Sequence, residues 1–260
     1  MNRVLIGCDP EFVIIKGRHS VSMCQIIKDD HKDNKIGLDM GRKVVELRPD
    51  PSDDIFVLVA HIRHLLKTIV DSRKGLKKCK FIAGHYAGDE PLGGHIHISC
   101  SSLRENNKLH AEDFTRFLDT IIGNGLMYTV NDMEAHNNRN DCDYGHLGDS
   151  RVGNSGSLEY RTPPSWLVSP SLAFMFLGLA KICAIIYLNP SDYSRKVVTE
   201  ATDYDGENGR PYLHKVLQIA KHRHAMMKMP DVVKCIELIE GVKRNTKHSW
   251  NVDFKPNWEI

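Results

Sequence analysis

The chain has 260 residues, of which 41% are hydrophobic and 26% are charged, and its formal net charge is +2. This composition is typical of a soluble globular protein, and the near-neutral balance gives no strong signal for nucleic-acid binding. The seven cysteines form no CxxC pair and the chain start lacks a signal-peptide apolar run. We therefore expect reduced thiols and a cytoplasmic location.

The first half of the chain alternates between strand and helix patterns. We expect a strand over residues 4–15, a second strand over residues 43–47, and a helix that Ser52 caps and Gly75 ends. Strands should follow at residues 81–83 and 96–99, and a helix over about residues 111–122.

The second half begins with a polar loop over residues 131–156, rich in Asn, Asp and Gly, whose length is typical of a functional lid. A strand at residues 157–161 and an apolar helix from Ser169-Pro170 to Leu188 should follow. Lys181 and Gly178 interrupt this helix, which is also short for a membrane span of about 20 residues, so we expect a buried core helix. After a polar link, residues 211–228 and 230–240 predict two more helices.

These patterns predict an α+β fold, with a curved, mainly antiparallel sheet and helices packed on one side. The sequence contains no internal repeat and no domain boundary. We expect one domain over residues 1–260, whose C-terminal part, about residues 189–260, is helical.

Four short segments carry polar side chains two residues apart. A strand has a side-chain period of two, so each pair should point to one face of a sheet. If the four strands share a sheet, that face holds acids, histidines and arginines and suits metal ions and phosphates. The pairs are Asp9 with Glu11, Glu46 with Arg48, His95 with His97, and Glu159 with Arg161.

The chemistry of this face favours metal-assisted phosphoryl transfer. Mg²⁺ and Mn²⁺ prefer carboxylate oxygens, and Mn²⁺ also accepts imidazole. So many acids on one face would repel one another unless cations lie between them. The guanidinium groups of Arg48 and Arg161, with Arg151 as a third, match the geometry of phosphate. A charged strand is more often a solvated surface, but such surfaces are rich in lysine, and none of the eight paired residues is lysine.

Three segments resemble the motifs of glutamine synthetase-fold ligases, in the same chain order. The run IGCDPEF (residues 6–12) resembles their first metal-binding strand, GHIHIS (94–99) their His-x-His strand, and LEYRTP (158–163) their Glu-x-Arg-x-Pro strand. The chain is most similar to the phage and bacterial branch of carboxylate–amine (COOH–NH2) ligases, the amidoligases. The resemblance covers most of residues 4–188. It implies that the cytoplasm is that of the host if a phage encodes the protein.

The resemblance implies a role for each site residue. Glu11 and Glu46, with Asp39 as a third acid, would hold a metal beside the substrate, whereas Asp9, His95 and Glu159 would hold the metal that bridges the ATP phosphates. His97 would contact an ATP phosphate or the substrate, Arg161 and Arg151 would bind phosphate, and Arg48 would bind a substrate carboxylate or neutralise nearby acids. Asp9 stands where the family has Glu, and its shorter reach would shift or weaken that metal.

The resemblance therefore implies an ATP-dependent carboxylate–amine ligase that forms an amide through an acyl phosphate. Its cofactors would be ATP and two or more Mg²⁺ or Mn²⁺ ions, and its partners small-molecule or peptide carboxylates and amines, without a membrane. The sequence favours no oligomeric state. Two alternatives stay open: a zinc-dependent metallohydrolase that uses His95 and His97, and a non-catalytic binding module with the same fold.

Overall fold

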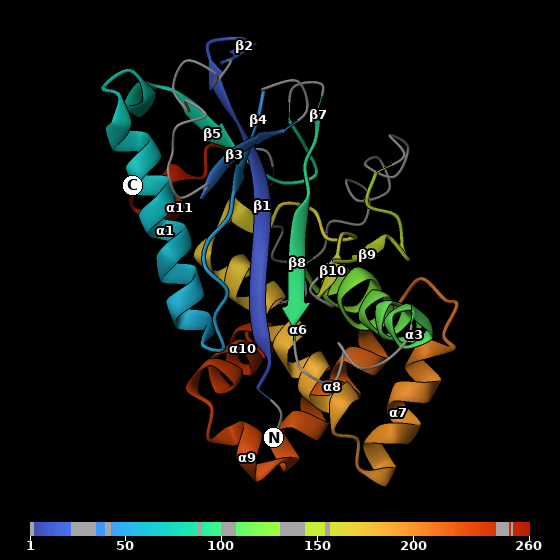
Figure 1. Ribbon diagram of the computed structural model, residues 1–260. Helices are drawn as coiled ribbons and strands as arrows, with labels where there is room; N and C mark the ends of the chain where they lie inside the picture. The colour runs from blue at the N-terminus through green and yellow to red at the C-terminus, as the bar shows by residue number, and fades with distance from the viewer. Residues whose placement is uncertain are drawn as a thin grey trace.

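The computed structural model describes residues 3–21, 35–39, 43–87, 90–99, 108–130, 144–153, 157–242, 250 and 252–260. Its main sheet has eight antiparallel strands in the order β3-β4-β1-β8-β10-β9, and β2 and β5 also pair with β1 (Figure 1). The strands are β1 (Leu5–Lys16), β2 (His19–Ser20), β3 (Ile36–Asp39), β4 (Val44–Leu47), β5 (Lys80–Ile82), β8 (Gly94–Ser99), β9 (Ser150–Val152) and β10 (Leu158–Tyr160). A separate hairpin pairs β6 (Tyr86–Ala87) with β7 (Glu90–Pro91).

Strand β1 is the centre of the sheet. Its first half pairs with β8 and its second half with β4 and β5. Ile6, Phe12 and Ile14 alternate along it into the core, and the strand ends before Gly17, whose φ of 66° favours glycine. The residues between these apolar positions, which include Asp9 and Glu11, therefore lie at the middle of the opposite face.

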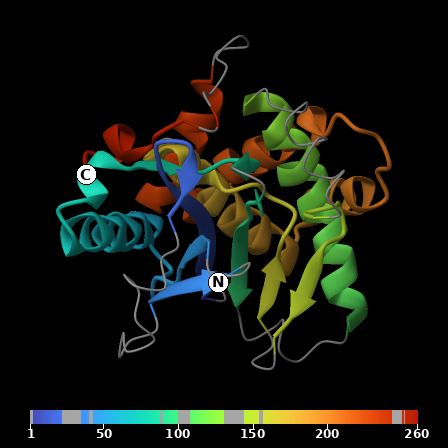
Figure 2. The same cartoon turned by 90° about the horizontal axis from the view of Figure 1, so that it is seen from above.

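The helices cover the apolar side of the sheet, which confirms the predicted α+β fold. Helix α6 packs against both β1 and β8, and α1, α8 and α10 pack against α6. Figure 2 shows this helical layer on one side of the strands. The helices are α1 (Ile55–Ser72), η3 (Leu76–Lys78), α3 (Lys108–Leu118), the π-helix η4 (Asp119–Leu126), α4 (Met127–Val130), η5 (Trp166–Val168), α6 (Pro170–Leu188), α7 (Asp192–Thr202), α8 (Arg210–His222), α9 (His224–Met227), α10 (Pro230–Glu240) and α11 (Lys255–Trp258).

Helix α6 begins as its sequence predicts, with the Ser169 side chain accepting a hydrogen bond from Leu172 N and Pro170 in the first turn. It is long and apolar enough to cross a membrane, but 83% of its most apolar 18-residue stretch is buried inside the protein. The core-helix expectation therefore fits this structure.

Several predicted element boundaries are wrong for identifiable reasons. Ser52 does not cap α1, because its backbone pairs with Ile6, and the Asp54 side chain accepts from Phe56 N instead. The predicted loop contains β9, which gains its hydrogen bonds from β10. The helix expected over residues 111–122 continues as the buried π-helix η4 and α4, since its glycines pack closely against Leu147 and Leu213 rather than ending the helix.

The C-terminal half also differs from expectation. The stretch predicted as a polar link forms α7, an amphipathic helix that buries Val197 and Ala201 and begins with a capping box between Ser191 and Ser194. The single helix expected over residues 211–228 is two helices, because Arg223 has an extended backbone between α8 and α9. The helical patterns of residues 211–228 and 230–240 predict helices that are present. The break at Arg223 depends on tertiary packing.

A buried ion pair links three helices of the layer that covers the sheet. Lys181 Nζ on α6 lies 2.6 Å from Asp231 Oδ2 on α10, and the same oxygen accepts from Ile55 N at the start of α1. We expect Lys181→Met to lower the free energy of unfolding by about 3–5 kcal/mol, because it leaves Asp231 buried without its cation. Urea unfolding measures this change.

Lys196→Met is the matched control, since Lys196 is exposed and lies 3.9 Å from Glu200 on the surface of α7. It should change the free energy of unfolding by less than about 0.5 kcal/mol. Equal effects of the two substitutions would contradict a stabilising role for the buried pair.

Candidate active site

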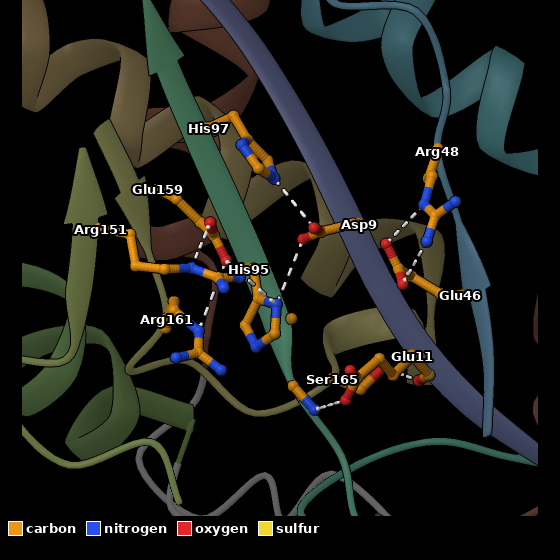
Figure 3. A network of polar contacts seen from close by, with 12 residues as sticks. Asp9, Glu11, Glu46, Arg48, His95, His97, Arg151, Glu159, Arg161 and Ser165 are labelled. Atoms are coloured by element: carbon orange, nitrogen blue, oxygen red, sulfur yellow. Dashed lines mark hydrogen bonds and ion pairs between the residues drawn. The ribbon is translucent and has the colours of Figure 1, made fainter. Parts of the chain in front are cut away.

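The sheet register places polar residues of β1, β8, β10 and β9 in one row. Asp9 on β1 lies opposite His95 on β8, while His97 lies opposite Glu159 on β10. Glu159 in turn lies opposite Arg151 on β9. Because alternate residues of a strand share a face, these side chains gather on the side of the sheet away from α6, as Figure 3 shows.

Asp9, His95 and Glu159 form the centre of this row. His95 Nδ1 lies 3.3 Å from Asp9 Oδ1 and 3.9 Å from Glu159 Oε1. One ligand atom from each residue lies within 4.8 Å of the others, and among the described residues this is the group that could hold a metal ion. His95 is 5% exposed and Glu159 9% exposed, so the three donors are largely removed from solvent.

Asp9 is suited to bind a cation. Its Oδ1 atom is buried, and within the described part of the chain nothing donates a hydrogen bond to it. Burial alone would raise the pKa of Asp9, but its contacts with His95 and His97 outweigh this effect and hold the pKa below its usual range. Asp9 is therefore ionised at neutral pH, with one oxygen available to a metal.

His97 contacts the second carboxylate oxygen of Asp9. Its Nε2 atom is 3.0 Å from Asp9 Oδ2. Burial lowers the pKa of His97, but the hydrogen bond and charge of Asp9, with smaller contributions from Glu159 and Glu46, raise it above the usual value. His97 therefore carries more positive charge than a free imidazole, which suits contact with an anionic group.

Two arginines hold Glu159 from the other side. Arg151 donates to both carboxylate oxygens, at 2.9 and 2.6 Å, and Arg161 Nε lies 3.4 Å from Oε1. Arg161 also lies 3.4 Å from Asp149 Oδ1. Arg151 is mostly exposed, so its guanidinium group is accessible to a ligand at this edge of the sheet.

Glu46 and Arg48 form a separate pair across β1 from Asp9 (Figure 3). Arg48 Nε and Nη2 donate to the two oxygens of Glu46 at 2.8 and 3.0 Å. Gly37 on β3 makes room for this guanidinium group, because a Cβ there would lie 2.7 Å from it. The pair borders a cleft of ≈530 Å³ whose walls also include Asp9, His97 and Ser99.

Glu11 contacts residues that the sequence did not reveal as part of the site. Glu11 is 2% exposed, and its carboxylate accepts a hydrogen bond from Gly93 N at 2.6 Å. The hydroxyl of Tyr144 lies 3.3 and 3.4 Å from its two oxygens and 2.9 Å from His95 Nε2. Tyr144 lies in the segment expected to be a loop, and no spacing pattern marked it. Asp39, the remaining candidate, lies in β3 opposite Val44, and its side chain is outside the part that the structure describes.

Asp119 anchors the segment that carries Tyr144. It lies on η4 and accepts hydrogen bonds from Gly148 N, Tyr160 Oη and Thr162 Oγ1 at 2.7, 2.8 and 3.1 Å. Burial nevertheless raises its pKa to about 6, although these hydrogen bonds partly oppose the rise.

This pKa predicts a pH-dependent stability. Between about pH 4 and about pH 6 the folded protein keeps a proton that the unfolded chain has lost, so the free energy of unfolding falls as pH rises through this window. The contribution of Asp119 to this fall should be about 3 kcal/mol, and Asp119→Asn should lack it. Urea unfolding of both proteins across this window measures the difference, and parallel pH profiles would contradict the assignment.

Comparison with known proteins gives a family match and distant structural neighbours. The family described as "Phage phiEco32-like COOH.NH2 ligase-type 2" matches residues 6–260. No curated protein matches the chain. The crystal structure of a bifunctional glutathione synthetase from Pasteurella multocida is similar with a TM-score of 0.57 and 11% identity, over 92% of this chain and 46% of that one. This chain thus spans under half the length of that enzyme, and the similarity shows a shared fold alone.

Two structures of GmaS are similar at lower scores. Apo GmaS without ligand has a TM-score of 0.48 and 15% identity, over 92% of this chain and 68% of that one. A GmaS/ADP complex has a TM-score of 0.46 and 14% identity, over 92% of this chain and 69% of that one.

Proposed function

The chain belongs to the phage phiEco32-like COOH.NH2 ligase-type 2 family, and from this membership we propose that it is an ATP-dependent carboxylate–amine ligase acting through an acyl phosphate. The observation that carries the proposal is the group of Asp9, His95 and Glu159, with two arginines bound to Glu159. A divalent cation beside guanidinium groups is the usual equipment of phosphoryl transfer. We propose that one catalytic unit spans residues 1–260.

The donors of this group fit Mg²⁺ or Mn²⁺. Two carboxylates and one imidazole match the ligand preferences of Mn²⁺ and, less closely, of Mg²⁺. Asp9 Oδ1 is a buried anionic oxygen to which no described residue donates a hydrogen bond, and a cation would satisfy it. When bound, the metal would neutralise negative charge on the phosphates of ATP.

A second ion would bind to Glu11, Glu46 and Asp39. Glu11 and Glu46 are paired directly across β1 and β4, and Asp39 lies two residues beyond Gly37, which is the partner of Glu46 on β3. In this arrangement Arg48 would bind a substrate carboxylate or neutralise the acids beside it. Its bidentate contact with Glu46 fits either role.

The cleft beside Asp9 and His97 is our proposed nucleotide site. His97 supplies a partly positive imidazole at its wall, and Arg151 and Arg161 lie beyond Glu159 at the other end of the row. Their guanidinium groups would hold the phosphoryl group during transfer and stabilise its charge.

The reaction would proceed in two balanced steps. A substrate carboxylate oxygen attacks the γ-phosphorus of ATP, ADP leaves, and an acyl phosphate forms. An amine then attacks the acyl carbon, inorganic phosphate leaves, and the amine nitrogen loses a proton to give the amide. Water would hydrolyse the acyl phosphate, so the reaction requires that water be excluded from the site.

Hydroxylamine offers a direct test of the acyl phosphate, because it replaces the amine and converts any activated carboxylate into a hydroxamate. We expect the protein, with ATP and Mg²⁺ or Mn²⁺, to form a hydroxamate from at least one carboxylate in a mixed pool. Formation that does not depend on ATP would contradict the proposal.

The two alternatives make different predictions. A zinc metallohydrolase would retain one tightly bound Zn²⁺ through His95 and His97 and would not respond to ATP. A binding module would keep its function after Glu159→Gln or Glu11→Gln. Metal analysis of the purified protein, combined with its melting temperature with and without ATP and Mg²⁺, separates the ligase from the hydrolase.

A further inference from the structure

The hydroxyl of Tyr144 joins the two groups of proposed metal ligands. It lies 2.9 Å from His95 Nε2 and within 3.4 Å of both oxygens of Glu11. The ring is held as well, since the guanidinium carbon of Arg161 lies 5.8 Å from its centroid. Tyr144 therefore contacts one residue of each ligand group and one proposed phosphate-binding arginine.

His95 Nδ1 faces Asp9 and Glu159, so it is the nitrogen that would bind the metal. A neutral imidazole that binds a metal through one nitrogen carries its proton on the other. In the metal-bound state His95 Nε2 would therefore donate to the Tyr144 hydroxyl, and the hydroxyl would direct its own proton to Glu11.

We propose that Tyr144 is a positioning residue that holds the His95 ring in the orientation needed for Nδ1 to bind the metal. The inference rests on the proposed function, because it assigns how that metal site is prepared. Groups that bond the second nitrogen of a metal-binding histidine commonly fix its tautomer and ring orientation. Here a hydroxyl that also contacts Glu11 lies at the second nitrogen.

Backbone contacts around Gly93 keep this arrangement in place. Gly93 N donates to Glu11 Oε2 at 2.6 Å, and Gly93 O accepts from Glu11 N at 2.9 Å. Glu11 is thus fixed on both sides before it receives the Tyr144 hydroxyl. These two hydrogen bonds hold the Glu11 carboxylate beside the Tyr144 hydroxyl.

Tyr144→Phe tests the inference, because it removes the hydroxyl and keeps the ring against Arg161. We expect Mn²⁺ binding, measured by electron paramagnetic resonance, to weaken about tenfold or more, as is usual when the partner of a metal-binding histidine is lost. In the Mg²⁺-loaded wild type, nitrogen NMR should show the His95 imidazole protonated on Nε2, the nitrogen that faces Tyr144. Tyr204→Phe, which loses one hydroxyl bonded to Asn208 O, is the matched control and should bind Mn²⁺ as the wild type does.

The outcomes separate this inference from the proposed function. Wild-type Mn²⁺ affinity in Tyr144→Phe, or a Mg²⁺-loaded wild type whose His95 is protonated on Nδ1, would overturn the role of Tyr144 and leave the ligase intact. A wild type without any Mn²⁺ site would overturn the metal assignment itself. The NMR measurement needs only the wild-type protein, so it decides the question even if the variant folds poorly.

Discussion

Glu159→Gln should abolish ATP-dependent activity while leaving the protein folded. The substitution keeps the shape of the side chain but removes the charge that a divalent cation requires. It also removes the carboxylate that accepts hydrogen bonds from Arg151 at both oxygens and that forms an ion pair with Arg161. Changes to outer-shell partners alone reduce metal affinity or activity by about 10–100-fold, so we expect more than about 100-fold here.

Mn²⁺ affinity and ADP release are the measurements for this variant, and its melting temperature reports the fold. Glu200→Gln is the control, since Glu200 is a partly exposed acid on α7 that pairs with Lys215 and Lys196. It should retain wild-type affinity and rate. Wild-type Mn²⁺ affinity and ADP release in Glu159→Gln would contradict the role of this carboxylate as a metal ligand.

Gly93→Ala should disable the metal site by a steric route. A Cβ at this position would lie 2.2 Å from His95 Nε2 and 2.9 Å from the Tyr144 hydroxyl, closer than real Cβ contacts allow. The backbone has little freedom to move away, because Gly93 is bonded to Glu11 and bridged to Pro164. The His95 ring must therefore rotate out of position, and overpacking should lower the free energy of unfolding by about 1–3 kcal/mol.

The expected loss of Mn²⁺ affinity is again more than about 100-fold, since a ligand is displaced rather than a neighbour of one. Gly75→Ala is a close control: Gly75 has a right-handed helical backbone, and an added Cβ would meet no atom within 4 Å. That variant should match the wild type in both affinity and stability. Wild-type Mn²⁺ binding by Gly93→Ala would show that the His95 ring is not held as the structure describes.

The shared face of the four pairs could be predicted because it depends only on the period of a strand. Asp9, His95 and Glu159 lie at alternate positions of strands whose intervening residues include Ile96 and Tyr160, which are buried in the core. The sequence could not reveal which pairs lie adjacent, because neighbours are set by register. Register places Glu46 opposite Glu11 rather than beside His95 or Glu159. It also places Arg151 beside Glu159, through a strand within the predicted loop.

The supporting residues were harder to find for a different reason. Tyr144, Gly93 and Asp119 act through contacts between segments distant in the chain, and no local pattern encodes such contacts. Gly93 is one of two neighbouring glycines just before His95. Only the position of the His95 ring shows that there is no space for a side chain at Gly93. In the sequence, Asp119 is an ordinary polar position of a predicted helix. Its burial depends on the packing of η4 against β10, where the Tyr160 hydroxyl donates to it.

The most direct test of the ligase proposal is an ADP-release screen over pairs of carboxylates and amines, with Mg²⁺ and with Mn²⁺, using Glu159→Gln as the blank. The account predicts that at least one pair releases ADP with the wild type, that release requires both substrates for full rate, and that the blank stays silent. Release of ADP from no pair, or equal release by the wild type and Glu159→Gln, would contradict it.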